Sequence, residues 1–525
     1  MKKTRLFLII ALLAVFQTQA QRYFSYQGPD ILKNTFLFTD RSFLINANQL
    51  NQPEIDSLQG VIQVVAPKKV TDLTVHAAPF TVINSYNSRL PNRLNQGSAN
   101  PNVGWQQLYS FGVNVKWQNK LTIQLVPEHQ FAENLPFPQF PKTSTDWEQF
   151  YYYLNNIDNP ERQGEQQINN WNPGQSFIQY QYKNWLAKIS TENKWWGPAS
   201  FNPLILGSNA PGFLHGSIST GKPINTPIGN VEGELIGGLL SSSGYDPPEQ
   251  NRISTWSNTW LYQPKREADR YLVGLVYSLQ PKWVPGMYVG FAKIRMTYKN
   301  EFFSDASASM GSWFLRYALP KEQAEIYFEY GRSDTDLSIA NIFQSSPYGR
   351  GYTAGLKKGY TLGHTDQVIL LGVEITNLSL PEKEQVDNQP KSWYLDDYIR
   401  QGFTHKGRVL GAGIGPGSNA QTVYVQWMKK MSYVGLRFNR VIHNLDYYHS
   451  TKYYQSNHFN QYWATLNAAL YYSLNYKQVT FSGEVSWQRD YNYNWDWIRY
   501  TGNGFENIGA DELNYGGRLL IQYRF

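Results

Sequence analysis

The C-terminal segment from Leu513 to Phe525 reads "LNYGGRLLIQYRF", and its side chains alternate between two kinds with a period of two. One set consists of Tyr515, Gly517, Leu519, Ile521, Tyr523 and Phe525. The other set consists of Asn514, Gly516, Arg518, Gln522 and Arg524. Because successive side chains of a β-strand point to opposite sides of the sheet, the segment predicts a strand with one apolar face and one polar face.

The same alternation recurs upstream. In "YSFGVNVKW", residues 109–117, Phe111, Val113 and Val115 alternate with small or polar residues, and a short turn leads to a second alternating run at 121–125. Such strands are typical of membrane barrels, whose outer face meets lipid and whose inner face lines a polar lumen. Residues 70–525 are therefore predicted to form an all-β membrane protein, a closed antiparallel transmembrane barrel of about 16 to 18 strands. The alternative is a secreted β-sandwich; in the barrel, the terminal Phe525 would be an assembly signal.

The composition and the N-terminus agree with an exported barrel. The chain has 525 residues, of which 16% are aromatic and 17% charged, and its mean hydropathy is −0.50. It begins "MKKTRLFLIIALLAVFQTQA", a basic start followed by an apolar run and small residues, which predicts a signal peptide at 1–20 and export through the Sec pathway. Residues 21–69 are expected to form an N-terminal segment on the periplasmic or plug side, and the barrel to lie in the outer membrane.

Charge and motif content argue against several classes of function. Residues 1–20 carry three positive charges, so the formal charge falls from +7 to +4 on their removal, and nucleic-acid binding is not expected. There is no cysteine, and the eight histidines form no HExxH pair. "GAGIGPG" at 411–417 lacks the spacing of a dinucleotide loop. We therefore expect no enzyme activity, no catalytic residues, no metal and no cofactor.

Long polar loops alternate with short turns, which is the asymmetry of an outer-membrane barrel with long extracellular loops. Two inserted segments show helical rather than strand periodicity. One spans about 144–158, where Trp147, Phe150, Tyr151 and Leu154 recur at three- and four-residue spacing. The other spans about 392–402 and would end near Gly402. Such short helices are expected at one end of the barrel or in its lumen.

Three further stretches carry recognisable motifs: "KWWGPASFNPLILGSNAP" at 194–211, "VGWQQLYSFGVNVKWQNKLTIQLVPEHQ" at 103–130 and "FTHKGRVLGAGIGPGSNAQ" at 403–421. Together they resemble the Wzi capsule-assembly family. The resemblance covers most of residues 70–525 and is loose outside these motifs. It implies an outer-membrane barrel of about eighteen strands, helices that occlude the lumen, and a surface lectin that holds capsular polysaccharide to the cell.

The first of these stretches carries a predicted structural motif of Trp195, Trp196, Gly197, Pro198 and Asn209. Gly197 and Pro198 would fix a turn, and Asn209 would hydrogen-bond a loop backbone. Adjacent strand residues point to opposite faces, so one indole is expected on the wall or lipid side and the other toward the lumen. The motif is interpreted as a packing anchor rather than a ligand platform.

Aromatic and amide side chains gather in two late loops and suggest a glycan-binding site, because sugars offer C–H faces to rings and hydroxyls to amides. The candidate residues are Tyr447, Tyr448, Tyr453, Tyr454, Tyr493, Asn494, Trp495, Asp496 and Trp497. The predicted function is an outer-membrane lectin that anchors capsular or exopolysaccharide at the cell surface. The alternatives are a structural subunit of a secretion or surface complex, and a diffusion channel. Expected partners are polysaccharide, outer-membrane lipids and other envelope proteins.

The predicted lumen charges are nearly balanced, which favours a braced and filled interior over an ion-selective pore. The cations assigned to the lumen are Lys116, Lys183, Lys293, Arg295, Arg316, Arg437 and Arg518. The anions are Glu232, Glu234, Glu325, Glu329, Glu374 and Glu484.

Overall fold

A computed structural model gives the structure of residues 73–118, 120–142, 147–247, 249–255, 257–303, 306–333, 349–363, 367–380, 392–429, 432–452, 462–496 and 510–525. The predicted signal peptide at 1–20 and the segment at 21–69 lie outside the described residues. No helix in the described part of the chain is long and apolar enough to cross a bilayer.

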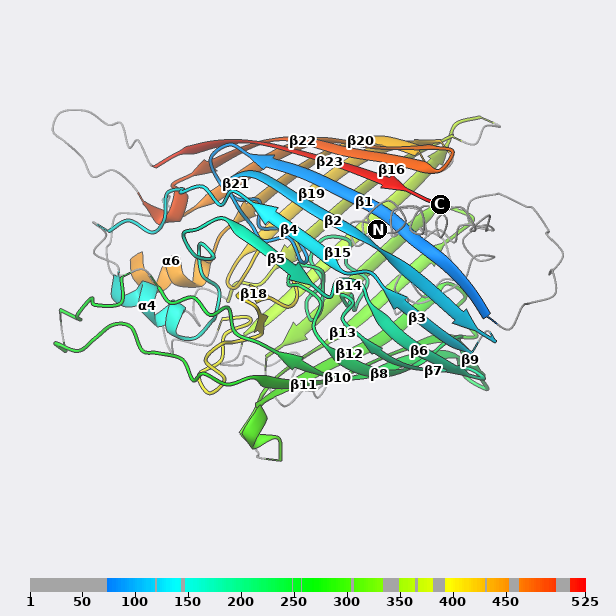
Figure 1. The fold of residues 1–525 in the computed structure, drawn as a ribbon, viewed down its shortest axis with the longest axis horizontal. Coiled ribbons are helices and arrows are strands. Elements are labelled where there is room, and N and C mark those ends of the chain that lie inside the picture. Colours follow the sequence, from blue (N-terminus) through cyan, green and yellow to red (C-terminus); the bar gives the residue numbers. More distant parts are fainter. Residues whose placement is uncertain are drawn as a thin grey trace, which may run out of the picture.

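The chain closes into an antiparallel barrel (Figure 1). Its first strand, β1 (Leu73–Asn87), pairs with its last, β23 (Glu512–Tyr523), from Phe80 opposite Tyr523 to Asn87 opposite Gly516. The described sheet contains 21 strands. At three positions around the wall, two short strands together take the place of one long strand, so the closed barrel has 18 strand positions. Closure leaves no unpaired strand edge to face lipid, which is what a bilayer requires. The predicted fold class is confirmed, at the upper end of the expected strand count.

The wall is built in chain order. After β1 come β2 (Gly104–Trp117), β3 (Leu121–Leu125), β4 (Glu128–Ala132), β5 (Ile168–Asn172), β6 (Phe177–Tyr182), β7 (Trp185–Ser190), β8 (His215–Thr220), β9 (Ile224–Thr226), β10 (Gly229–Leu240), β11 (Arg270–Pro281) and β12 (Met287–Tyr298). The second half consists of β13 (Ala308–Leu319), β14 (Ala324–Arg332), β15 (Arg350–Thr361), β16 (Gln367–Asn377), β19 (Asn419–Lys429), β20 (Ser432–Ile442), β21 (Ala464–Tyr476), β22 (Val479–Tyr491) and β23. The pairs of short strands that share one position in the wall are β3 with β4, β5 with β6, and β8 with β9.

Side chains alternate between the two surfaces of the wall as the sequence predicts. In β23, Tyr515 and Tyr523 are exposed on the outer surface, whereas Asn514 and Gln522 are buried inside. Short turns join strands at one end, and long segments join them at the other, on the left of Figure 1. Long loops are extracellular in outer-membrane barrels, so we call this the loop end.

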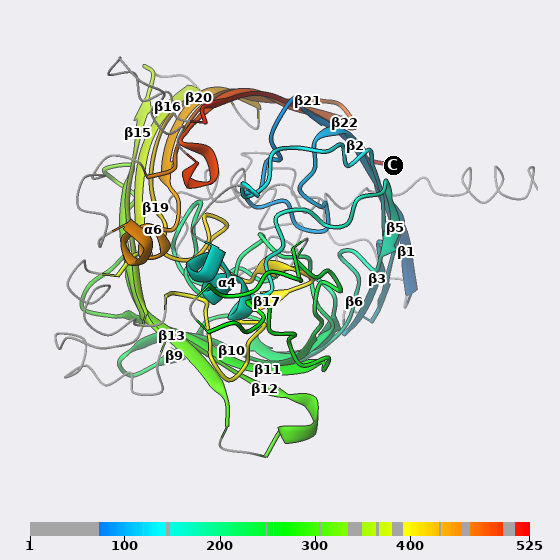
Figure 2. The same ribbon diagram turned by 90° about the vertical axis from the view of Figure 1, so that its left-hand side faces the viewer.

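Two of the long segments fold inward and form a plug, defined here as residues 191–214 and 392–418 (Figure 2). The second carries a small hairpin of β17 (Thr404–His405) and β18 (Arg408–Val409). One apolar core joins both segments to the inner face of β10–β13. Its members include Trp196, Leu204, Phe213, Trp393, Tyr394, Phe403, Ile236, Leu272, Val276, Ile294, Met296 and Phe314. The plug is therefore held against one side of the barrel.

Two α-helices, α4 (Trp147–Asn155) and α6 (Leu445–Lys452), lie at the loop end (Figures 1 and 2). The first falls within the predicted helix at 144–158, and it buries Trp147, Phe150, Tyr151 and Leu154 as the spacing indicates. The second falls in a stretch that was expected to be loop.

The helix predicted at 392–402 does not form. That segment runs through turns and bends, and Tyr394 has a left-handed φ of +74°. The Asp396 carboxylate accepts hydrogen bonds from the backbone N–H groups of Tyr398 (2.9 Å) and Ile399 (2.7 Å), a local bond that competes with helix formation. Of the apolar side chains that suggested a helix, Trp393, Leu395 and Ile399 are buried in the plug core instead, whereas Tyr398 is exposed.

Most of the predicted lumen charges do face inward, and several of them form ion pairs. Arg316 and Lys357 flank Glu325 at 2.7 and 3.5 Å, and Arg437 meets Glu484 at 2.8 Å. Such pairs brace the interior, because removing one partner would leave a buried charge uncompensated.

Three of the predicted lumen cations are corrected by the structure. Lys183 lies exposed in the turn between β6 and β7. Lys293 and Arg295 are on the outer surface of β12, because Ile294 and Met296 turn inward to meet the apolar plug. The polar-inside rule fails locally where the lumen is filled by an apolar core.

Candidate functional site

The segment from Lys194 to Asn209 fixes the plug in place. Trp196 is buried against β11, and its indole N–H donates to Glu234 at 3.2 Å. Trp195 is also buried and donates to the carbonyl of Ala199 at 3.1 Å, so neither ring faces lipid. The two rings do not divide between opposite strand faces, because residues 191–196 form no strand.

The turn that follows the two tryptophans is held by carboxylates from the wall. Gly197 has φ +90°, and a Cβ there would lie 2.6 Å from an oxygen of Glu329, so the position requires glycine. Glu374 on β16 accepts hydrogen bonds from the backbone N–H groups of residues 200–202. The Asn209 amide donates to the carbonyl of Val409 at 3.1 Å and so ties the two plug segments together.

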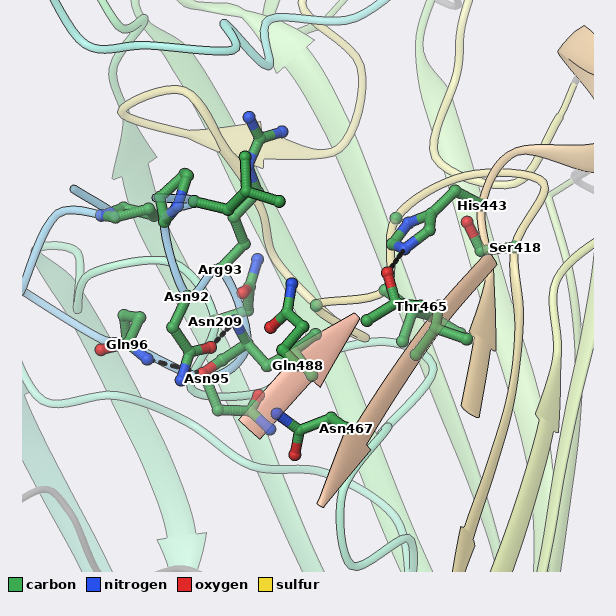
Figure 3. A pocket seen from close by; sticks show the side chains of 18 of the residues that line it. Asn92, Arg93, Asn95, Gln96, Asn209, Ser418, His443, Thr465, Asn467 and Gln488 are labelled. Atoms are coloured by element: carbon green, nitrogen blue, oxygen red, sulfur yellow. Dashed lines mark hydrogen bonds between the residues drawn. The ribbon is translucent and has the colours of Figure 1, made fainter. Parts of the chain in front are cut away.

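Opposite the apolar plug core, a partly enclosed cavity of about 300 Å³ separates the plug from the inner face of β19–β23 and β1. It starts among the loops and reaches the Arg437–Glu484 pair halfway down the wall. Figure 3 shows amide side chains pointing into it from both sides: Asn95 and Gln96 from the β1–β2 loop, Asn209 from the plug, and Asn467 and Gln488 from β21 and β22. The lining also holds four arginines and three carboxylates. Its neutral amides suit a ligand rich in hydroxyl groups.

Aromatic rings line the loop end of this cavity. His443 stacks on Trp463 with ring centroids 3.8 Å apart, and Trp463 meets the edges of Tyr493 at 4.9 Å and Trp495 at 5.4 Å. Phe150 of α4 also lines the cavity. These rings come from three separate loops, so they hold the mouth of the cavity together as well as offering faces to a ligand.

Asp490 organises the wall side of the mouth. Its carboxylate accepts hydrogen bonds from the Trp463 indole at 2.8 Å, the Thr465 hydroxyl at 2.5 Å and the Gln488 amide at 2.7 Å. The Thr465 hydroxyl is also bonded to His443 at 2.8 Å (Figure 3). These bonds fix the orientation of the side chains on which a ligand would rest.

Glu161 organises the plug side of the mouth. Its carboxylate accepts hydrogen bonds from the backbone N–H of Phe140 and, at 2.8 Å, from the amide of Asn494. Arg93 donates to the Glu161 carbonyl at 3.0 Å. Burial raises the pKa of Glu161, and the hydrogen bonds and the Arg93 charge oppose that shift.

Three buried polar atoms on uncharged cavity-lining residues have no hydrogen-bond partner among the described residues. They are the amide oxygens of Asn95 and Asn209 and the indole N–H of Trp495. A buried polar group without a partner is costly, so such atoms are expected to meet a ligand or water. Trp495 also has a left-handed φ of +54°, which a bulky residue rarely adopts. Strain of this kind concentrates at functional sites.

The predicted glycan-contact residues divide into three groups. Tyr493, Asn494 and Trp495 line the cavity. Tyr447 and Tyr448 are buried in α6, where Tyr447 packs on Trp495 from behind at 4.5 Å, and Asp496 is half-buried and lies outside the cavity lining. Tyr453, Tyr454 and Trp497 lie outside the described residues.

Sequence reasoning missed the amides that converge from distant parts of the chain. Asn467 and Gln488 could have been found, because strand alternation directs them into the lumen. Arg93, Asn95 and Gln96 gave no such signal, since their place depends on an irregular loop that folds back into the barrel. In the part of the chain that the structure describes, no three His, Cys, Asp or Glu side chains gather in a way that could hold a metal ion.

Comparison with known proteins identifies a solved structure with a similar fold. No protein-family model matches the chain, and no curated protein matches its sequence. Among solved structures, the fold resembles Wzi from Escherichia coli, described as an outer-membrane protein involved in group 1 capsule assembly and as a carbohydrate-binding β-barrel. The TM-score is 0.58 at 11% identity, over 95% of this chain and 97% of that one.

Two porins from other bacteria match less well. OccAB2 from Acinetobacter baumannii gives a TM-score of 0.43 at 13% identity, over 86% of this chain and 98% of that one. A BenF-like porin from Pseudomonas fluorescens gives 0.40 at 11% identity, over 86% and 98%. At 11% identity, the similarity to Wzi shows the barrel fold alone.

Proposed function

We propose that this protein is an outer-membrane lectin, without enzymatic activity, that holds capsular or exopolysaccharide at the cell surface. The observation that carries the proposal is the cavity between the plug and β19–β23, where unpartnered amide and indole groups lie beside aromatic rings. Sugars present hydroxyls that both donate and accept hydrogen bonds, together with apolar C–H faces that cover rings. The carbohydrate binding described for Wzi, whose fold is similar, supports the same function.

Binding at one such site is expected to be weak. A ring that covers a sugar face buries apolar area and so contributes on the order of 1 kcal/mol to the binding free energy. A polymer that binds many copies of the protein at once would nevertheless be retained, because simultaneous binding at several sites raises the overall affinity far above that of one site. Moderate salt should weaken retention only slightly, since neutral amides and rings carry most of the contact.

The test is binding of polysaccharide purified from the same cells to the detergent-solubilised protein. Asn467→Leu removes an amide from the cavity wall, whereas Asn225→Leu makes the same change at an exposed site on β9, at the other end of the barrel. Loss of one net hydrogen bond should weaken binding by about fivefold in Asn467→Leu and leave the control unchanged. If the intact protein binds no polysaccharide, the proposal fails.

The diffusion-channel alternative is separated by conductance. The apolar core between plug and wall fills one side of the lumen, and the Arg437–Glu484 ion pair lines the cavity on the other side. We therefore expect no steady ion current across planar bilayers that contain the protein. A large and stable conductance would favour the channel.

A further inference from the structure

One cation inside the barrel has no carboxylate beside it. Lys116 lies on the inner face of β2, next to the last residue of the strand and at the turn end of the barrel, on the right of Figure 1. Its ammonium group forms no ion pair with any residue that the structure describes, whereas Arg316 meets Glu325 at 2.7 Å elsewhere in the lumen. A partly buried charge without a counterion is costly, so an anion is expected to accompany it.

The wall around Lys116 carries no negative side chain. The strands β1, β2, β3 and β6 adjoin one another in this part of the wall, and none of them contains an aspartate or a glutamate. Glu128 of β4 lies opposite Ser110 of β2, which is about 20 Å along the strand from Lys116. Its carboxylate accepts a hydrogen bond from the hydroxyl of Ser98. These strands therefore offer Lys116 no counterion of their own.

Polar groups without partners lie next to Lys116 on the same inner surface. Asn114, the next inward residue of β2, is fully buried, and neither polar atom of its amide has a hydrogen-bond partner among the described residues. The same holds for Nδ1 of His76 and for the amide oxygen of Gln124. A buried polar group without a partner is costly, so such groups are expected to meet an ion, a water molecule or a ligand.

The strand register brings these groups together. Thr74 of β1 and Thr122 of β3 lie opposite Lys116 on either side, and His76 lies opposite Asn114. Side chains opposite one another on neighbouring strands have Cβ atoms about 5 Å apart, so one patch presents an ammonium group, an amide, an imidazole and two hydroxyls. Each of these groups can donate a hydrogen bond, and the ammonium group adds a positive charge. Such a set suits a small oxyanion, because its oxygens accept charge-assisted hydrogen bonds.

The patch lies at the seam where the barrel closes. Pairing between β1 and β23 begins only at Phe80. Among the described strands, residues 73–78 of β1 pair with β2 alone, and Thr74 and His76 belong to this part. An anion bonded to side chains of both β1 and β2 would hold the start of β1 against the wall.

We propose that Lys116, Asn114 and His76, together with the two threonine hydroxyls, bind a small free oxyanion such as inorganic phosphate inside the turn end of the barrel. The bound anion would balance the charge of Lys116 and stabilise the first strand. The site is distinct from the polysaccharide cavity, because Ser85 of β1, which lines that cavity, is about 30 Å along the strand from His76. The proposal does not depend on polysaccharide binding.

Binding of inorganic phosphate to the detergent-solubilised protein tests the proposal, measured by broadening of the phosphorus NMR signal at constant ionic strength. Lys116→Gln removes the charge from the site, and Lys120→Gln makes the same change in the exposed turn between β2 and β3. We expect saturable binding to the intact protein. Binding should be about tenfold weaker in Lys116→Gln, because a hydrogen bond from a charged donor is lost, and unchanged in Lys120→Gln.

Asn114→Leu provides a second variant, which removes the amide at nearly unchanged side-chain volume. In phosphate-free chloride buffer this variant should unfold at the same temperature as the intact protein or higher, because it buries no amide without a partner. Phosphate should raise the unfolding temperature of the intact protein, and should raise that of Asn114→Leu by less at the same concentration.

Two outcomes would overturn the proposal. The intact protein could show no saturable binding of phosphate. Alternatively, Lys116→Gln and Lys120→Gln could bind phosphate equally well, which would indicate general attraction of anions to the protein rather than a site at Lys116.

Discussion

Trp495 brings three properties of a binding residue together at one position. Its ring lines the cavity, its indole N–H is buried without a partner among the described residues, and its backbone adopts φ +54°. Phe140, Phe150 and Tyr447 continue the ring contacts behind it through α4 and α6. The backbone strain is therefore supported by packing, as functional strain has to be.

Replacing Trp495 with phenylalanine separates the ring from the N–H group. We expect Trp495→Phe to weaken polysaccharide binding about fivefold, because one hydrogen bond of about 1 kcal/mol is lost while the ring remains. The thermal unfolding temperature should change little. Binding that stays as tight as in the intact protein would show that the indole N–H does not meet the ligand. Isothermal titration with an oligosaccharide fragment measures the effect.

His443 predicts a pH dependence of stability. Burial, together with the nearby Arg93 charge, lowers the pKa of His443 to about 3, from an ordinary value of 6.5. The unfolded chain then binds a proton more readily than the folded one between those values, so stability is full above pH 6.5 and falls as the pH drops toward 3. The loss at pH 5 should reach about 2 kcal/mol.

His443→Gln tests this dependence, because glutamine keeps a polar contact to Thr465 and does not titrate. Thermal unfolding in detergent between pH 4 and 8 should show a flatter profile for the variant than for the intact protein. Parallel profiles would assign the acid sensitivity to other groups.

At the scale of elements, the turn after the two tryptophans controls the plug. Gly197→Ala would place a Cβ against Glu329 at a φ of +90°, whereas Gly363, with φ +60°, has open space around its Cβ position. Gly197→Ala should therefore destabilise the protein by about 1–3 kcal/mol, and Gly363→Ala by less. Equal unfolding temperatures for the two variants, measured by heat-dependent gel mobility, would contradict the role assigned to this turn.

Strands were predicted from the sequence more reliably than helices: the helix expected at 144–158 forms as α4, whereas the one expected at 392–402 does not. The alternation in Leu513–Phe525 depends on one residue and the next, so it is visible without knowledge of the fold. The apolar spacing at 392–402 looks helical, yet Asp396 caps its own backbone and the rings are drawn into the plug core. Tertiary packing determined the conformation of residues 392–402, and the periodicity of a sequence carries no information about such packing.

At the scale of the whole molecule, the barrel depends on closure between its ends. Phe525 is exposed on the outer surface, and its ring meets that of Tyr523 at 5.2 Å. Phe525 follows Tyr523, the residue at which β23 pairs with both β22 and β1. Deleting Phe525 should reduce the amount of folded barrel in the outer membrane, because the terminal aromatic residue is the predicted assembly signal and the barrel needs this closure to leave no free edge. Leu73→Ala, at an exposed position at the start of β1, serves as the control. Normal assembly of the deletion would show that the last residue is no signal.

The sequence allowed the barrel, its closure and its approximate strand number to be predicted, because the alternation of apolar and polar residues marks each strand and its two faces. The site was predicted only in part. Tyr493, Asn494 and Trp495 stood out by composition, but the cavity needs Asn95 and Asn209, which reach it through loops that fold into the lumen. Long-range convergence of irregular segments leaves no periodic signal in a single sequence.

The central claim is that polysaccharide occupies the cavity between the plug and β19–β23, and cysteine labelling tests it most directly. The chain contains no cysteine, so Asn467→Cys and Asn225→Cys each introduce a single thiol, inside the cavity and on exposed β9 respectively. The rate of reaction with a small maleimide is measured with and without saturating polysaccharide. We expect polysaccharide to slow labelling of Asn467→Cys severalfold and to leave Asn225→Cys unaffected. Unchanged labelling of Asn467→Cys, under conditions in which the polysaccharide is bound, would contradict the account.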